Sequence, residues 1–131
     1  PGTLSAMHTS GIGKALLAHA RPADLKRMIR EMRLERFTEM TLTDPQALLD
    51  ALARIRARGY ALDNEERTPG MRCIAAPIFD LAGEAAAGIS VSGPSLRMSD
   101  ARLEAMSEAV IEAARELSLG MAPASRAGES G

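Results

Sequence analysis

The chain has 131 residues, a length typical of one domain, and 46% of them are apolar, which is enough for a packed core. Aromatic residues make up only 2%, so Leu, Ile, Met, Val and Ala must build that core. The formal net charge is −1, whereas a protein that neutralises phosphates needs a clustered surplus of Lys and Arg, which argues against nucleic acid as a direct partner.

Three helices are predicted in the first half of the chain. The first begins near Thr9 or Ser10, either of which can cap it. The second has Pro22 at its first position, where the missing N–H of proline does no harm. The third is capped by Asp44 and ends at Gly59, because glycine readily adopts the left-handed conformation found at helix ends.

The pattern changes after Gly59 to three strands followed by one long helix. Alternation of apolar and polar residues indicates the first strand, and a continuous apolar run indicates a covered second strand. The predicted segments are the strands Tyr60–Glu66, Met71–Phe79 and Ala85–Ser92, a hairpin loop at Asp80–Gly83, and a helix at Asp100–Leu119. This order predicts an α+β fold in which helices pack on an antiparallel sheet.

The predicted sheet is small and has two open edges, which proteins normally pair or cover. We therefore expect residues 1–121 to form part of a domain whose first strands precede Pro1 in the complete protein. Residues 122–131 are small and polar, and they are predicted to be a disordered tail.

The start of the first helix is a candidate anion site. Helix geometry leaves the first amides without internal partners, and Gly11 and Gly13 would let an anion approach the backbone. A carboxylate or a phosphate would suit this position. The alternative is that Gly13 simply allows two helices to pack closely.

Small side chains on the predicted hairpin form a second candidate. Ser90 and Ser92 share one face of their strand with Gly88, which would leave a hollow there. Pairing the apolar sets of the two strands, Ile74, Ala76 and Ile78 with Ala87, Ile89 and Val91, places Cys73 opposite or near Ser90. The alternative is that Cys73 is only a small buried residue.

Asp63, near the centre of the first strand, is the acidic residue that best suits a binding site. Glu65 and Glu66 are interpreted instead as a solvated acidic edge. A thiol enzyme based on Cys73 lacks a nearby histidine or a nucleophile signature, and a metal site made by His8, Asp63 and Cys73 lacks the usual ligand spacing.

Taken together, four segments resemble the effector-binding domain of the IclR family of bacterial transcription regulators. The resemblance covers about residues 6–120, and it is carried by Met7–Ala18, Ile55–Asp63, Gly70–Asp80 and Ile89–Pro94, with Glu65 and Glu66 between the second and third. It implies a GAF-like or profilin-like fold with a pocket for small organic or aromatic acids. The ligand-contacting residues that it implies are Gly11, Ile12, Asp63, Met71, Cys73, Ser90 and Ser92.

Members of the family carry an N-terminal winged helix-turn-helix that has no counterpart in this sequence. The expected function is therefore sensing of a small carboxylate-containing metabolite, without a metal, a cofactor or an enzymatic activity. We expect a homodimer or tetramer that contacts DNA only through the absent N-terminal domain. The lone cysteine and the lack of a leader or membrane-spanning stretch predict a cytoplasmic protein with no membrane partner. The alternatives are an enzyme centred on Cys73 and a ligand-free oligomerisation module.

Overall fold

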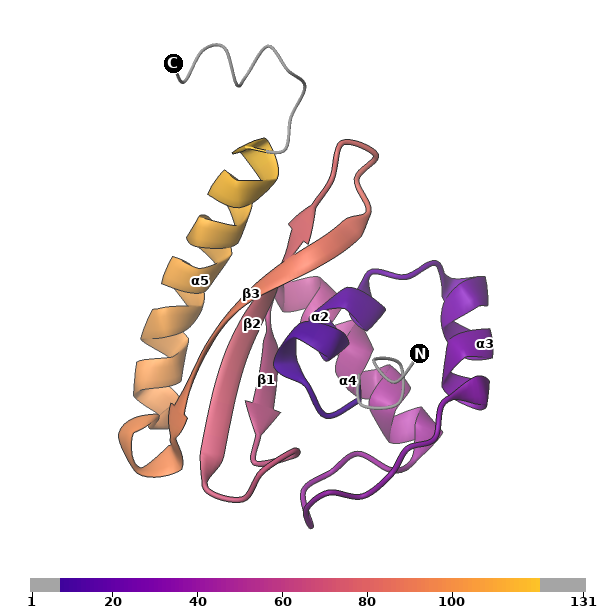
Figure 1. The fold of residues 1–131 in the computed structure, drawn as a ribbon, viewed down its shortest axis with the longest axis horizontal. Coiled ribbons are helices and arrows are strands. Elements are labelled where there is room, and N and C mark those ends of the chain that lie inside the picture. Colours follow the sequence, from indigo (N-terminus) through magenta and orange to yellow (C-terminus); the bar gives the residue numbers. More distant parts are fainter. Residues whose placement is uncertain (1–7, 121–131) are drawn as a thin grey trace.

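The structure, a computed structural model, describes residues 8–120 (Figure 1). The predicted tail at 122–131 lies outside the described residues. The elements, in chain order, are α2 (Gly11–Ala18), α3 (Pro22–Glu31), α4 (Pro45–Arg58), β1 (Ala61–Asn64), β2 (Met71–Phe79), β3 (Ala85–Pro94), the 3₁₀ helix η1 (Ser95–Arg97) and α5 (Asp100–Gly120).

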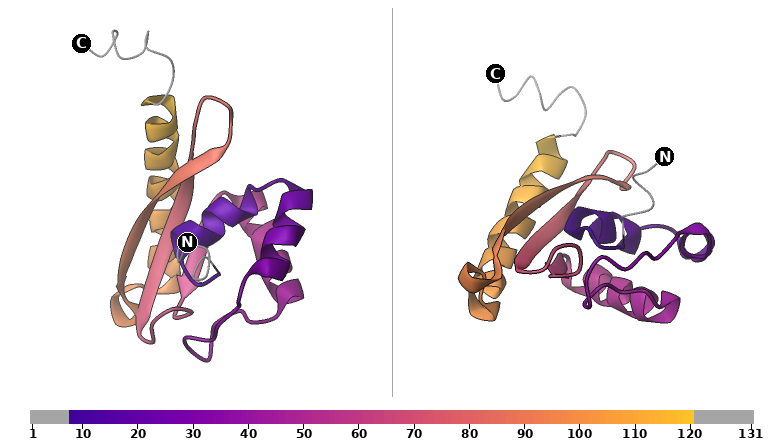
Figure 2. Two further views of the ribbon diagram at one scale, coloured as in Figure 1. Left: turned by 45° about the vertical axis from the view of Figure 1, so that its right-hand side comes forward. Right: turned by 60° about the horizontal axis from the view of Figure 1, so that its bottom comes forward.

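The strands form one antiparallel sheet with the order β1-β2-β3. Helix α5 covers one face, and α2 packs on the other with α3 and α4 outside it (Figures 1 and 2). Each face has its own core: Leu17, Leu48, Leu52 and Ile55 are among the buried residues on the α2 side, and Ile74, Leu103 and Val110 on the α5 side. This arrangement confirms the predicted α+β fold.

The predicted helix ends are confirmed by their capping contacts. The Gly13 amide donates to Ser10 Oγ at 3.0 Å, and the Ala47 amide donates to the Asp44 carboxylate at 2.9 Å. Gly59 ends α4 with φ 92°, a conformation that favours glycine. Short-range chemistry therefore fixes these boundaries.

The first strand is shorter than predicted. It ends at Asn64 rather than Glu66, because Glu65 has φ 58° and turns the chain away from the sheet. The third strand is longer than predicted, extending through Pro94 rather than stopping at Ser92. The turn after β1 brings Glu66 back toward α2, which matters for the site.

The hairpin pairs the apolar residues as predicted. Ile74 lies opposite Val91, and Ala76 lies opposite Ile89. Cys73 is directly opposite Ser92, while Ser90 is the diagonal neighbour opposite Ala75. The small side chains therefore gather on the face that α2 covers.

Beyond Ala75, β2 has no pairing with β1. Its odd-numbered residues direct their backbone groups to that side, as the bond from the Glu65 amide to the Met71 carbonyl shows. At Pro77 no N–H exists to be paired, and the Phe79 amide donates to Ser118 Oγ of α5 at 2.9 Å. This half of the strand edge therefore offers no free N–H donor at residues 77 and 79.

Candidate functional site

A hollow of about 310 Å³ opens where the N-terminal end of α2 meets β1 and the β2–β3 hairpin. Five of the seven predicted site residues line it: Gly11, Asp63, Met71, Cys73 and Ser92. The other lining residues are Ser10, which was predicted only as a helix cap, and Arg67, Thr68 and Arg72, which were not among the predicted site residues. The structure thus brings the helix tip and the hairpin together at one place.

Ile12 and Ser90 do not line this hollow. The Ile12 side chain packs on β3, where a Cβ at Gly88 would lie 2.8 Å from Ile12 Cγ2. Ser90 is exposed and hydrogen-bonds the Cys73 side chain. Ile12 can therefore take part only through its backbone amide, whereas Ser90 contacts Cys73, which lines the hollow.

The tip of α2 lies almost directly on β2. A Cβ at Gly11 would be 3.0 Å from Cys73 Sγ and 3.3 Å from Ala75 Cβ, tighter than ordinary contacts. The first intrahelical bond joins the Lys14 amide to the Ser10 carbonyl at 2.9 Å, so helix geometry leaves the Gly11 and Ile12 amides without an intrahelical acceptor. Close packing and a potential anion site coincide here.

Asp63 is a buried carboxylate at the edge of the hollow, with 8% of the residue exposed. Its Oδ1 accepts a hydrogen bond from the Glu66 amide at 2.9 Å. Burial raises the pKa of Asp63 above 3.8, and the Glu66 carboxylate adds to this, while backbone amides and the Lys14 charge lower it. The fold thus holds an ionisable group in a position that disfavours its charge.

Replacing Asp63 by Asn should therefore stabilise the protein, and the gain should depend on pH. An acid whose pKa is higher in the folded state binds protons more tightly when folded, so its ionisation above pH 3.8 weakens the fold. The difference in unfolding free energy between Asp63→Asn and wild type should grow from pH 3.8 upward and level off above the folded pKa. Urea unfolding from pH 3.5 to 7.5 measures it, with exposed Asp50→Asn as the control. If the difference in unfolding free energy between Asp63→Asn and wild type grew toward acid pH, the pKa of Asp63 would be lowered instead.

The Cys73 thiol does not have the environment of a nucleophile. Burial raises its pKa above 9.0, and the Asp63 carboxylate raises it further, while the Ser90 hydrogen bond and the Lys14 charge oppose the shift. His8 is directed elsewhere, with its Nε2 2.8 Å from the Glu35 carbonyl oxygen. The geometry thus gives no support to the thiol-enzyme alternative.

Alkylation of Cys73 should keep accelerating above pH 9, because the thiolate is the reacting species. Asp63→Asn should move the profile to lower pH, since it removes a nearby negative charge. Iodoacetamide kinetics between pH 6 and 10.5, with a short cysteine peptide as reference, measures both effects. A rate that is already at its plateau below pH 8 would revive the enzyme hypothesis.

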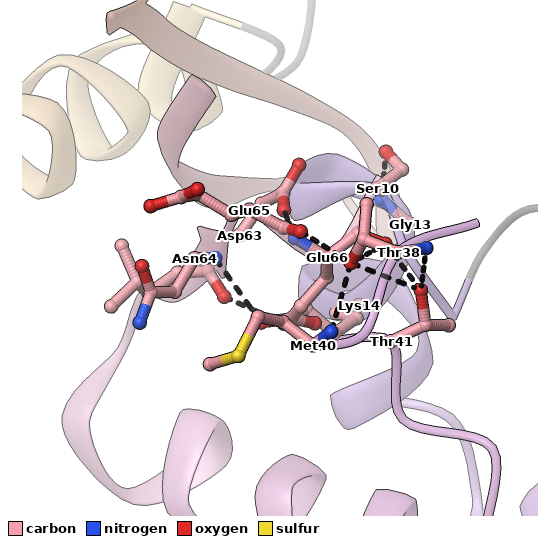
Figure 3. A network of polar contacts seen from close by, with 11 residues as sticks. Ser10, Gly13, Lys14, Thr38, Met40, Thr41, Asp63, Asn64, Glu65 and Glu66 are labelled. Carbon is pink, nitrogen blue, oxygen red and sulfur yellow. Dashed lines mark hydrogen bonds and ion pairs between the residues drawn. The ribbon is translucent and has the colours of Figure 1, made fainter. Parts of the chain in front are cut away.

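Glu66 was predicted to lie on a solvated edge, and this prediction is wrong. Its carboxylate forms an ion pair with Lys14, whose Nζ lies 2.6 Å from Glu66 Oε1, and both residues are buried (Figure 3). Lys14 Nζ also donates to the Leu62 carbonyl at 2.6 Å. A lysine in the first turns of a helix gives no sequence signal that distinguishes this role from ordinary exposure.

Two arginines, Arg67 and Arg72, line the hollow. Arg72 donates to the Met98 carbonyl at 2.6 Å and to Asp100 Oδ1 at 2.7 Å, so its charge is held in place. The Arg67 guanidinium lies 5.7 Å from the centre of the Phe37 ring. Between residues 8 and 120 no group of three or more His, Cys, Asp or Glu is arranged to hold a metal ion.

Comparison with known proteins decides the family. The sequence model of the family described as "Bacterial transcriptional regulator IclR C-terminal" matches residues 1–119. The chain belongs to the IclR family. It is 85% identical over 129 residues to the HTH-type transcriptional regulator BhcR of Paracoccus denitrificans (strain Pd 1222), covering 98% of this chain and 46% of that protein. This IclR-family chain thus spans about half the length of the curated relative.

Solved structures of the family agree with the fold. The C-terminal domain of the Escherichia coli regulator KdgR matches with a TM-score of 0.82 and 41% identity, over 88% of this chain and 70% of that one. The inducer-binding domain of the Acinetobacter transcription factor PobR, a double mutant in complex with 3-hydroxybenzoic acid, matches with a TM-score of 0.78 and 26% identity, over 86% and 66%. These IclR-type relatives are named as transcriptional regulators, not enzymes. Within the described range, no helix is both long and apolar enough to cross a membrane.

Proposed function

We propose that this chain is the ligand-sensing part of an IclR-family regulator and that it binds a small carboxylate-containing metabolite in the hollow beside α2. The observation that carries the proposal is the convergence of the α2 tip, Asp63, Cys73 and Ser92 on one hollow of about 310 Å³. That size lies at the lower end of known small-molecule sites, which fits a small acid.

The carboxylate of the ligand would accept hydrogen bonds from the Gly11 and Ile12 amides and from the Ser92 hydroxyl. The helix dipole alone contributes only about 0.3–1 kcal/mol, so these bonds must supply most of the affinity. Met71 would contact the apolar part of the ligand, and Ser90 would act through Cys73. Because Asp63 is itself acidic, it would accept a hydrogen bond from a polar donor group on the ligand rather than face its carboxylate.

The complex of PobR with 3-hydroxybenzoic acid supports this assignment, because that ligand carries both a carboxylate and a hydroxyl group. The chemical requirement deduced from Asp63 is the same combination of an anion and a donor. No aromatic side chain is among the described residues that line the hollow, so an aromatic ligand would find no stacking partner among them.

In the complete cytoplasmic protein we propose a homodimer or tetramer in which residues 1–121 are part of the sensor and a separate N-terminal domain binds DNA. Further strands of the sensor would pair with the free side of β3. Ligand binding would change DNA affinity only if the ligand prefers one of two assembly states.

Isothermal titration against acetate, lactate, succinate, benzoate and 3-hydroxybenzoate tests the proposal. Ser92→Ala and Asp63→Ala should each weaken the best acid at least tenfold, about 1.4 kcal/mol. Exposed Asp50→Ala on α4 is the matched control and should bind as wild type does. Equal binding by all variants would place the ligand elsewhere, and no binding of any acid by wild type would favour the ligand-free oligomerisation module.

A further inference from the structure

Three segments that are distant in sequence meet in one network of polar contacts (Figure 3). They are α2, the turn that follows β1, and the connection between α3 and α4. At their centre is Lys14, with 2% of the residue exposed, whose ammonium group contacts the Glu66 carboxylate and the Leu62 carbonyl. Neither Lys14 nor Glu66 lines the hollow itself.

Glu66 connects this ion pair to Asp63. One carboxylate oxygen, Oε1, accepts a hydrogen bond from the Lys14 ammonium group. The other, Oε2, accepts a hydrogen bond from the Asn64 amide at 3.2 Å. The Glu66 amide in turn donates to Asp63 Oδ1 at 2.9 Å. The carboxylate that borders the hollow is therefore held by the same residue that is paired with α2.

The connection between α3 and α4 fixes the turn from its outer side. Thr41 Oγ1 donates to the Glu66 carbonyl at 2.6 Å, and Thr38 Oγ1 donates to the Glu65 carbonyl at 2.5 Å. Glu65 has its positive φ at this point, so the turn bends sharply while both carbonyls are bound. The position of Glu66 is thus determined from both sides.

A buried ion pair is a poor source of stability, because removing two charges from water can cost more than their attraction returns. An apolar pair of similar size would fill the same volume. What an apolar pair lacks is direction, since hydrogen bonds at 2.6 Å fix both distance and angle between two elements. The ion pair is therefore suited to setting geometry rather than to stabilising the fold.

We propose that Lys14 and Glu66 are positioning residues that set the distance between the Asp63 carboxylate and the amides at the tip of α2. The part of this inference that concerns ligand affinity rests on the proposed function. Lys14 lies one turn after Gly11 in the same helix, and Glu66 lies three residues after Asp63. Their contact thus joins the two walls that a bound acid would bridge.

The test uses the double variant Lys14→Met, Glu66→Leu, which keeps the buried volume and removes both charges. Amide hydrogen exchange at residue 66 reports directly on the bond to Asp63 and needs no ligand. We expect exchange at residue 66 to be at least tenfold faster than in wild type. Affinity for the best acid of the panel should fall at least tenfold. Asp44→Ala, which removes the cap of α4, controls for a general loss of stability and should leave residue 66 and the affinity unchanged.

Unchanged exchange at residue 66 would overturn the proposal, whatever the acids do. Faster exchange with full affinity in a protein that binds would overturn it too, because the geometry would then not matter to the ligand. If wild type binds none of the acids, the proposed function fails, and the exchange measurement alone decides whether the pair positions Asp63. If the double variant does not fold, Glu66→Gln replaces it, because it loses the charge and the bond to the Asn64 amide but keeps the shape of the side chain. Exchange at residue 66 should then be at least threefold faster, and affinity for the best acid should be at least threefold weaker.

Discussion

Lys14→Met should destabilise the protein by about 3–5 kcal/mol, because it leaves the Glu66 carboxylate buried without its partner. Glu66 has only 8% of its surface exposed, and its remaining donor on that side is the Asn64 amide at 3.2 Å. One backbone amide does not replace a full charge. Urea unfolding followed by circular dichroism measures the loss.

The double variant Lys14→Met, Glu66→Leu completes the comparison and should regain most of that stability, ending within about 1.5 kcal/mol of wild type, as volume-conserving core changes usually do. The matched control is Lys26→Met on the exposed surface of α3, which should change stability by less than about 0.5 kcal/mol. Wild-type stability in Lys14→Met would mean that Glu66 escapes to solvent without cost. That result would contradict the rigid turn described for Glu65 and Glu66.

Gly11→Val should weaken ligand binding at least tenfold, or by about 1.4 kcal/mol. The first added carbon would lie 3.0 Å from Cys73 Sγ and 3.3 Å from Ala75 Cβ. The tip of α2 would have to move away from β2, carrying its two amides out of reach of the Ser92 side of the hollow. Overpacking of this kind also costs about 1–3 kcal/mol of stability.

Gly93→Val is the matched control for this change. A Cβ at Gly93 would meet the flexible Met98 side chain at 3.5 Å, which is ordinary contact, so binding and stability should stay close to wild type. Adding Cys73→Ala to Gly11→Val removes the nearest atom and should restore part of the affinity. Equal binding by Gly11→Val and wild type would remove the α2 tip from the site.

The sequence predicts those parts of the structure that depend on short-range chemistry. Ser10 and Asp44 cap their helices as expected, because a cap acts over three residues. The pairing of Ile74 with Val91 follows from the apolar alternation of two strands that are joined by a short loop. Residue chemistry pointed separately to Gly11, Asp63, Cys73 and Ser92, and Met71 was predicted only from the family resemblance. That these five residues line one hollow depends on the long-range packing of α2 on the sheet.

The Lys14–Glu66 ion pair could not be predicted in this way. Its two members are 52 residues apart, and each carries a charge that normally indicates an exposed position. The turn at Glu65 was not predicted either, because the alternation of apolar and polar residues alone extends the strand to Glu66. Ser90 and Ile12 do not line the hollow, because Ser90 lies opposite Ala75 rather than Cys73, and the Ile12 side chain packs against Gly88.

Pro77 and the Ser118 hydroxyl make the two edges of the sheet unequal in their ability to pair with a further strand. A further strand at this edge of β2 would find no N–H donor at Pro77, and the N–H of Phe79 is already bound to Ser118. This part of the edge therefore disfavours β-augmentation. The opposite edge of the sheet is β3 (Ala85–Pro94). This strand has no charged residue, and its only proline is the last residue. On the outer edge of β1, the Leu62 carbonyl and the Asn64 amide are already bound by the Lys14 and Glu66 side chains. A polypeptide that lengthens this sheet is therefore expected to pair with β3.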